Sequence, residues 1–153
     1  MTQTDIDPRL RKILTTTRVI GLVGLSNKPT RASFRVAEFL AARGYRVIGV
    51  NPGLAGQEMF GEVVVASVKD LPPETDMIDL FRNSDAVGPI VDDALEALPG
   101  LRTVWMQLEI FNAGARQAAE AKGIEVIEDH CPKIEYPRLF GDRPLAELSE
   151  VSV

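Results

Sequence analysis

The stretch "RVIGLVGLSNKPTRASFRVAEFLAARGYRVIGVNP", residues 18–52, decides the fold. Its first seven residues, 18–24, are a continuous and largely β-branched apolar run that ends in glycine, which is typical of a parallel strand covered on both faces. Residues 33–44 carry apolar side chains at helical spacing and end in glycine, a common helix stop. A second apolar run follows at 45–52. The stretch therefore predicts a strand, a helix and a second strand.

The same alternation continues along the chain. Helices are predicted near 84–98 and 112–123, and one short helix near Leu145 within a proline-broken end. Further strands are predicted at 62–67, 76–82, 102–108 and 124–129. Short connections between alternating strands and helices predict a mainly parallel sheet of about six strands with helices on both faces.

This pattern indicates an α/β, Rossmann-like, doubly wound fold. In such sheets the ligand binds beyond the carboxyl ends of the strands, near the point where strand order reverses. Candidate functional residues are therefore expected in the loops that follow strands.

Length and composition set further limits. The chain has 153 residues and 45% hydrophobic content, which suits one domain spanning residues 1–153. A formal net charge of −5 argues against a nucleic-acid partner. No apolar run approaches the ~20 residues of a membrane helix, and the first residues lack the apolar segment of a secretory signal. The one cysteine, Cys131, cannot form an internal disulfide, so a cytoplasmic location is expected.

The loop after the first strand, "GLSNKPTR", departs from the dinucleotide-binding pattern G-x-G-x-x-G. A helix N-terminus favours phosphate through its free N–H groups and its dipole. Lys28 and Arg31 add positive charge, and Ser26 and Asn27 add hydrogen-bond donors. An ordinary capped turn, with Thr30 or Ser33 as N-cap, is the alternative. Within a first strand–helix unit, phosphate binding is the favoured interpretation.

The end of the second strand argues against NAD. Proteins that bind NAD usually place a carboxylate there to bind the ribose hydroxyls. This chain has Asn51-Pro52-Gly53, with no carboxylate before Glu58. An uncharged Asn51 with Arg46 nearby would tolerate a phosphate on that ribose. Alternatively, Asn-Pro-Gly simply terminates the strand.

Three later loops add candidates. Arg82 could reach an anion, while Asn83 or Ser84 caps the next helix. Gln107 and Glu109 lie at the carboxyl edge of the sheet, where Glu109 either accepts hydrogen bonds from a ligand amide or merely precedes a helix.

The sixth strand is followed by the only histidine, His130, and by Cys131. Their side chains are expected to point in different directions, so a thiol nucleophile is disfavoured. Two such residues are also too few for a zinc site. No catalytic residue and no metal ligand is assigned.

Taken in order, the segments 18–52, 76–95 and 104–136 resemble the family of stand-alone CoA-binding proteins. That family is similar to the N-terminal CoA-binding domain of the succinyl-CoA synthetase α subunit and of NDP-forming acyl-CoA synthetases. The resemblance covers about residues 15–141 and implies a Rossmann-like domain that holds coenzyme A across the strand ends.

The resemblance also implies a set of ligand-binding residues in four loops. The phosphates would lie against Gly24, Leu25, Ser26, Asn27 and Lys28, with Ser33 and Arg35 assisting. The adenosine would lie by Asn51 and Pro52, and the rest of the ligand by Phe81, Arg82, Asn83, Glu109, Cys131 and Pro132.

The synthetases carry their phosphorylated histidine and nucleotide-grasping parts in further domains, which are not expected in this chain. The expected function is therefore binding of CoA or an acyl-CoA by a non-catalytic carrier, sensor or accessory module. One alternative is an NAD(H)-binding redox enzyme or sensor with a modified glycine loop. Another is a subunit that shares CoA with a catalytic partner, and homo-oligomerisation is also open.

Overall fold

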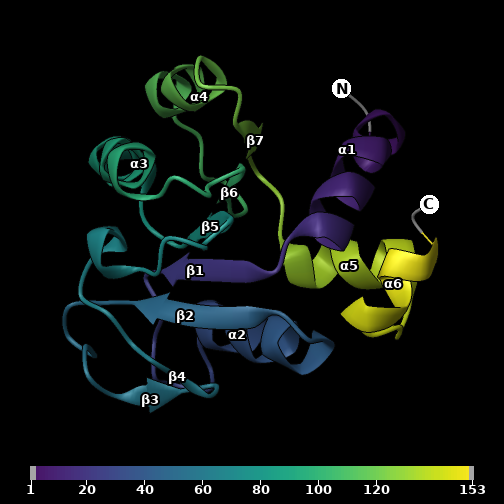
Figure 1. Cartoon of the computed structure of the whole chain (residues 1–153), viewed down its shortest axis with the longest axis horizontal. Helices are drawn as coiled ribbons and strands as arrows, with labels where there is room; N and C mark the ends of the chain where they lie inside the picture. The colour runs from purple at the N-terminus through teal and green to yellow at the C-terminus, as the bar shows by residue number, and fades with distance from the viewer. Residues whose placement is uncertain (1–2, 152–153) are drawn as a thin grey trace.

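A parallel sheet of five strands forms the centre of the molecule. The computed structural model describes residues 3–151, and its strand order is β2-β1-β5-β6-β7. These strands are β1 (Val19–Val23), β2 (Arg46–Val50), β5 (Met77–Leu80), β6 (Thr103–Met106) and β7 (Glu125–Ile127). Almost every strand residue is buried, as expected of a sheet with helices on both faces (Figure 1). The predicted α/β doubly wound fold is confirmed.

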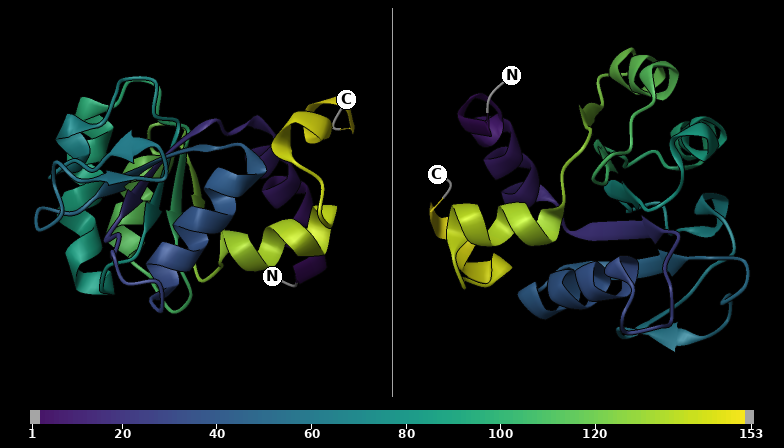
Figure 2. Two further views of the ribbon diagram at one scale, coloured as in Figure 1. Left: turned by 90° about the horizontal axis from the view of Figure 1, so that it is seen from below. Right: turned by 180° about the vertical axis from the view of Figure 1, so that it is seen from behind.

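Two apolar clusters cover the sheet, one on each of its faces. One cluster holds side chains such as Leu22 and Trp105, which pack with residues of α1 (Gln3–Thr16), α2 (Ala32–Arg43), α5 (Pro132–Phe140) and α6 (Leu145–Val151). The other holds side chains such as Ile78 and Val104. These pack with residues of the short helix η1 (Val68–Asp70), α3 (Ser84–Ala97) and α4 (Ala113–Glu120). Alternation of side chains along each strand produces this division, and Figure 2 shows both layers.

The strand predicted at 62–67 does not join the main sheet. Glu62–Val63 forms β4, which pairs antiparallel with β3 (Glu58–Met59) in a separate two-stranded sheet. Only Val65 reaches the main sheet, through a single bridge to Val50. The strand cannot extend further, because the apolar run ends at Ser67. Ser67 caps η1 by accepting a hydrogen bond from the backbone N–H of Lys69.

Helices α2, α3, α4 and α6 confirm the sequence predictions, but α1 and α5 were not predicted. Helix α5 contradicts the expectation of a proline-broken segment. Pro132 occupies its first turn, where a missing N–H costs nothing. Pro137 lies inside the helix beside the buried residues Tyr136 and Phe140, whose packing stabilises it.

Helix α1 covers the end of the sheet that lies away from the carboxyl ends of the strands. The Arg9 guanidinium donates to Glu125 at 2.9 Å and to the carbonyl of Val126 at 2.9 Å, which ties α1 to the edge strand β7. The Arg138 guanidinium contacts Asp7 at 2.6 Å and so joins α5 to α1. Figure 1 shows that both chain ends lie on this side.

Candidate functional site

The order β2-β1-β5 places a reversal of strand order beside β1. Helix α2, which follows β1, packs on one face of the sheet, and α3, which follows β5, packs on the other. The loops after β1 and β5 therefore part at the carboxyl edge. In doubly wound sheets a crevice for ligands forms at this point.

Gly24 allows these two loops to approach each other. Its φ of +88° is a conformation that L side chains rarely adopt. A Cβ atom at this position would lie 2.4 Å from the carbonyl oxygen of Phe81. The backbone N–H of Phe81 donates to Val23 at 2.9 Å, which holds the contact in place.

The first loop is organised by its own hydroxyl groups. Ser33 Oγ accepts from the backbone N–H of Ser26 at 2.9 Å, and Ser26 Oγ accepts from that of Lys28 at 3.1 Å. The Arg35 guanidinium donates to the carbonyl of Pro29 at 3.3 Å. The loop is therefore preformed around its backbone, with Lys28 exposed to solvent.

Three helices begin at this edge without a side-chain cap from any residue of 3–151. Their N-cap residues are Arg31 for α2, Asn83 for α3 and Cys131 for α5. The alternative of an ordinary turn with Thr30 or Ser33 as N-cap does not hold, because Arg31 is the N-cap residue and the Ser33 hydroxyl accepts from the backbone N–H of Ser26. A cap by Asn83 or Ser84 on α3 is likewise absent among these residues.

Ser84 Oγ accepts from the backbone N–H of Phe111 at 3.0 Å instead of capping α3. By contrast, Asn112 caps α4 by accepting from the backbone N–H of Ala115 at 2.9 Å. Among the described residues, the N-termini of α2, α3 and α5 thus lack the kind of side-chain cap that α4 has. Such ends expose N–H donors and the positive end of the helix dipole.

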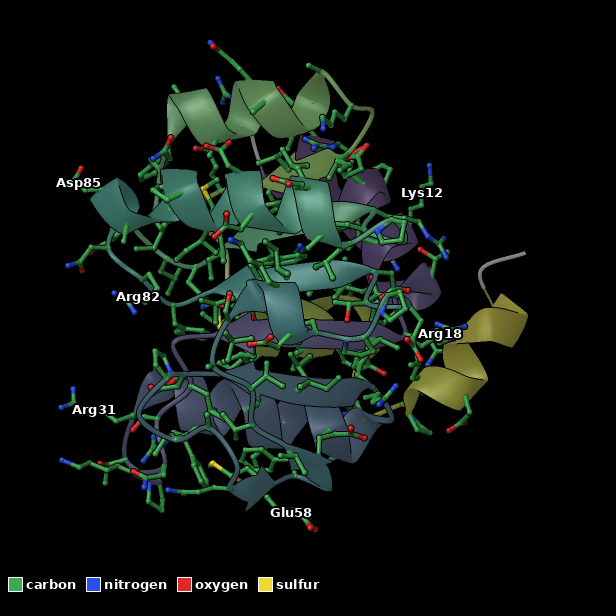
Figure 3. All side chains as sticks on the ribbon, turned by 60° about the vertical axis from the view of Figure 1, so that its left-hand side comes forward. Lys12, Arg18, Arg31, Glu58, Arg82 and Asp85 are labelled. Carbon is green, nitrogen blue, oxygen red and sulfur yellow. The ribbon has the colours of Figure 1, made fainter. Side chains whose placement is uncertain are left out.

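Unpaired cations lie at the same edge. Lys28, Arg31 and Arg82 form no ion pair within the described part of the chain. Figure 3 shows Arg31 and Arg82 projecting from one side of the molecule, while Lys12 and Arg18 lie towards the other. This edge therefore combines free N–H groups with positive charge that no described carboxylate neutralises.

A cavity of about 480 Å³ lies between the first loop and the end of β2. Its lining contains no carboxylate. The residues around it are Gly24, Leu25, Ser26, Asn27, Lys28, Arg31, Ala32, Ser33, Asn51, Gly53, Leu54 and Phe81. We call it the phosphate-loop cavity. It brings together seven of the ligand-binding residues that the resemblance implies, which are Ser33 of α2, Asn51 and the five residues 24–28, with Phe81 from the loop after β5.

Asn51 has both ends of its amide occupied. Its Nδ2 donates to the carbonyl of Leu25 at 2.7 Å, and its Oδ1 accepts from the backbone N–H of Gly53 at 2.8 Å. Asn51 thus clamps the first loop to the end of β2. Pro52 lies apart from this cavity, in a smaller hollow that it shares with Val68 and Arg82.

A second cavity, of about 300 Å³, adjoins the first and shares Ala32 and Phe81 with it. We call it the Gln107 cavity. Its other lining residues are Arg82, Asn83, Gln107, Leu108, Ile110 and Cys131. Sequence reasoning placed Gln107 at the sheet edge but not among the ligand residues, and it did not single out Leu108 or Ile110. The signal for Gln107 was its position directly after β6.

Of the remaining candidates, Glu109, Arg35 and Pro132 lie outside both cavities, whereas Cys131 lines the Gln107 cavity. Glu109 has a φ of +66°, and its backbone N–H donates to Asp129 at 2.7 Å. Arg35 supports the first loop, and Pro132 is buried in the first turn of α5. Cys131 is 7% exposed and unbonded to another cysteine.

His130 does not form a catalytic pair with Cys131. Its Nδ1 lies 2.7 Å from the carbonyl of Glu128, and its own carbonyl accepts from Nε1 of Trp105 at 2.8 Å. Within residues 3–151, no group of three or more His, Cys, Asp or Glu side chains could hold a metal ion.

Comparison with known proteins identifies the family. Residues 18–137 match the sequence model of the CoA binding domain. The chain belongs to this CoA-binding family. It is 32% identical over 125 residues to the uncharacterized protein YneT of Bacillus subtilis strain 168, which covers 82% of this chain and 90% of YneT.

Solved structures agree with this assignment. The protein ID.343 from Thermus thermophilus is 35% identical, with a TM-score of 0.82 over 88% of this chain and 98% of that chain. A dinucleotide-forming acetyl-coenzyme A synthetase 1 from Ca. Korarchaeum cryptofilum shares the fold, with a TM-score of 0.61 at 23% identity. That match spans 75% of this chain and 26% of the synthetase. The predicted resemblance is thereby confirmed. Among the described helices, none has the length and apolar character needed to cross a membrane.

Proposed function

We propose that this protein binds coenzyme A or an acyl-CoA in the cleft formed by the two cavities, as a non-catalytic carrier, sensor or accessory module. One observation carries the proposal. The uncapped N-terminus of α2, with the unpaired cations Lys28 and Arg31, faces a cavity that no carboxylate lines. Phosphate groups are the ligands that such an arrangement favours.

The geometry suits a long ligand with phosphates at one end. CoA carries a pyrophosphate and a 3′-phosphate on its nucleotide part, and an uncharged pantetheine arm that ends in a thiol. We place the phosphates against the first loop and the adenosine beside Gly53 and Leu54. The arm then passes Phe81, which lines both cavities, and enters the Gln107 cavity.

The state of Asn51 supports CoA over NAD. A ribose-binding carboxylate needs free oxygens for two hydroxyl groups, but both ends of the Asn51 amide are engaged with the backbone. A neutral, already bonded side chain at this position offers the ribose little and does not repel a phosphate attached to it.

Calorimetric titration with CoA, dephospho-CoA and NAD⁺ tests the proposal. CoA is expected to bind, and dephospho-CoA to bind about tenfold more weakly, since one charge-assisted interaction is lost. NAD⁺ is expected to show no binding at the same concentration. Binding of NAD⁺ without binding of CoA would overturn the proposal in favour of a nicotinamide-dependent protein.

Further parts of the proposal concern the whole chain. We treat residues 1–153 as one CoA-binding domain with a core at about 15–141, located in the cytoplasm. A protein partner or a second copy of the chain is also proposed. Native mass spectrometry of the freshly purified protein tests the ligand and the assembly together, because it reports both the bound ligand and the number of chains.

A further inference from the structure

A fully buried carboxyl group lies beneath the Gln107 cavity. Asp79 occupies the centre of β5 and is 0% exposed. Its neighbours Ile78 and Leu80 belong to the cluster under α3 and α4, so Asp79 faces the opposite layer, towards α2 and α5. In the sheet it lies between Leu22 of β1 and Trp105 of β6. A carboxyl group in such an apolar position needs a reason.

Gln107 contacts this carboxyl group. With the Gln107 amide oriented so that both of its ends are satisfied, its nitrogen donates to Asp79 Oδ1 at 2.8 Å and lies 3.2 Å from Oδ2. Gln107 is itself 6% exposed and lines the cavity. No ion pair involves Asp79 within residues 3–151. Asp79 and Gln107 therefore form a buried polar pair at the base of the cavity.

Stability alone does not account for the pair. Exchanging two buried hydrogen-bonded partners for apolar groups of the same shape is often neutral or stabilising. What the pair achieves is a fixed orientation of the Gln107 amide. An amide nitrogen has two hydrogens. An Asp79 carboxyl oxygen accepts a hydrogen bond from one of these hydrogens, and the other is left to donate to a group inside the cavity.

We propose that the Gln107 cavity is the subsite for the thioester end of an acyl-CoA, with Gln107 as the specificity-determining residue and Asp79 as its positioning residue. The inference rests on the proposed function. The second amide hydrogen of Gln107 donates to the carbonyl oxygen of the acyl group, which free CoA lacks. Phe81, Leu108 and Ile110 provide apolar walls for the acyl chain.

The size of the cavity specifies the class of ligand. At about 300 Å³ it lies at the small end of the range for ligand pockets. It must hold the end of the pantetheine arm as well as the acyl group, so a short acyl chain fits best. The preferred ligand is thus a short-chain acyl-CoA such as acetyl-CoA.

Calorimetry with acetyl-CoA and S-ethyl-CoA tests the role of the carbonyl group. The two compounds match in size, but the thioether has no carbonyl oxygen. The wild-type protein is expected to bind acetyl-CoA about fivefold more tightly, which corresponds to one neutral hydrogen bond. Gln107→Met removes the donor while keeping the side-chain length. It is expected to bring the ratio of the two affinities to about one.

Two variants at Asp79 separate positioning from folding. Asp79→Asn keeps an acceptor for Gln107 and is expected to retain the preference for acetyl-CoA. Asp79→Leu removes the acceptor and is expected to lose it. Circular dichroism shows which variants fold. If Asp79→Leu does not fold, Gln107→Met and Asp79→Asn are enough to test the proposal.

Two results overturn the proposal. An affinity ratio near one in the wild type, with both compounds bound, excludes the thioester subsite but leaves CoA binding intact. A ratio that Gln107→Met leaves unchanged assigns recognition to another residue. If no CoA compound binds at all, this inference and the proposed function fail together.

Discussion

At Gly24 a single missing side chain determines how closely two loops of the cleft can meet. Gly24→Ala is expected to destabilise the protein for two reasons, a strained positive φ and a Cβ atom 2.4 Å from a backbone oxygen. Gly123→Ala is the matched control, because Gly123 has a φ of +77° but no heavy atom within 4 Å of an added Cβ. Urea unfolding should show a loss of about 1 kcal/mol for the control and at least 2 kcal/mol for Gly24→Ala. Equal losses would mean that the loops can part freely.

Lys28 tests the charge of the first loop. Lys28→Ala is expected to weaken CoA binding about tenfold and to reduce its dependence on salt, since one cation–phosphate contact disappears. Lys12→Ala removes the same charge from the other side of the molecule (Figure 3) and should leave both quantities unchanged. Titrations at two salt concentrations measure the effect. An unchanged affinity for Lys28→Ala would remove this residue from the site.

Asp79 should make stability depend on pH. Burial raises the pKa of its carboxyl group well above the usual value of 3.8. Above about pH 4 the unfolded chain loses this proton while the folded protein keeps it, so the free energy of unfolding falls until the folded pKa is passed. Asp79→Asn cannot titrate. The stability of the wild type relative to this variant should therefore be greatest at low pH and decline as pH rises.

Urea titrations of both proteins between pH 4 and pH 8 measure this difference, in which the contributions of other titrating groups cancel. A constant difference would mean that Asp79 has the same pKa in the folded and unfolded states.

At the scale of elements, the free end of α2 is the central feature. Arg31 already has the extended backbone of an N-cap residue, with φ −82° and ψ 145°. Arg31→Asp should therefore cap the helix and stabilise the free protein by about 1 kcal/mol. The same carboxylate would accept hydrogen bonds from the N-terminal N–H groups of α2 and would repel phosphate. The affinity for CoA should therefore fall at least tenfold.

Helix α4 provides the reverse control for this prediction. Asn112→Ala removes its cap and should cost about 1 kcal/mol while CoA affinity stays the same. Tight CoA binding by Arg31→Asp would show that the N-terminus of α2 does not hold the ligand.

The elements also show what could be predicted from the sequence. Apolar periodicity between strands predicts helices α2, α3 and α4. The fold and the position of the first loop could therefore be predicted from local sequence pattern. Helix α5 did not, because prolines mask a helix that depends on the packing of Tyr136 and Phe140. The segment at 62–67 has the composition of a strand, but strand pairing is decided by neighbours in space.

The site divides in the same way. The residues around the phosphate-loop cavity are mostly consecutive, so one loop indicated them. The Asp79–Gln107 pair joins two adjacent strands and requires knowledge of their register. A buried aspartate in the apolar run 76–82 was the one sequence signal, and periodicity alone gives it no partner.

At the scale of the whole molecule, the cleft and the chain ends occupy opposite sides. Helices α1 and α6 and the C-terminal end of α5 form the side away from the carboxyl ends of the strands, as Figures 1 and 2 show. The contacts of Arg9 with Glu125 and of Arg138 with Asp7 join these helices to the sheet and to each other. The cleft, by contrast, lies between loops that lead into α2, α3 and α5. The N-terminal N–H groups of these three helices have no side-chain cap from residues 3–151. Ligand binding should therefore stabilise the fold from the side where its polar groups lack partners.

This stabilisation predicts a ligand-dependent melting temperature. A ligand that binds only the folded state adds about 2.7 kcal/mol at a concentration of 100 times its Kd. For a domain of this size, each kcal/mol raises Tm by roughly 2–4 °C, so CoA should raise Tm by about 5–10 °C. NAD⁺ at the same concentration should leave Tm unchanged. CoA should raise the Tm of Arg31→Asp by no more than about 3–6 °C, because at least tenfold weaker binding lowers the stabilisation to about 1.4 kcal/mol or less. Equal shifts with wild type and Arg31→Asp would place the ligand elsewhere on the molecule, because the free end of α2 would then contribute nothing to its binding.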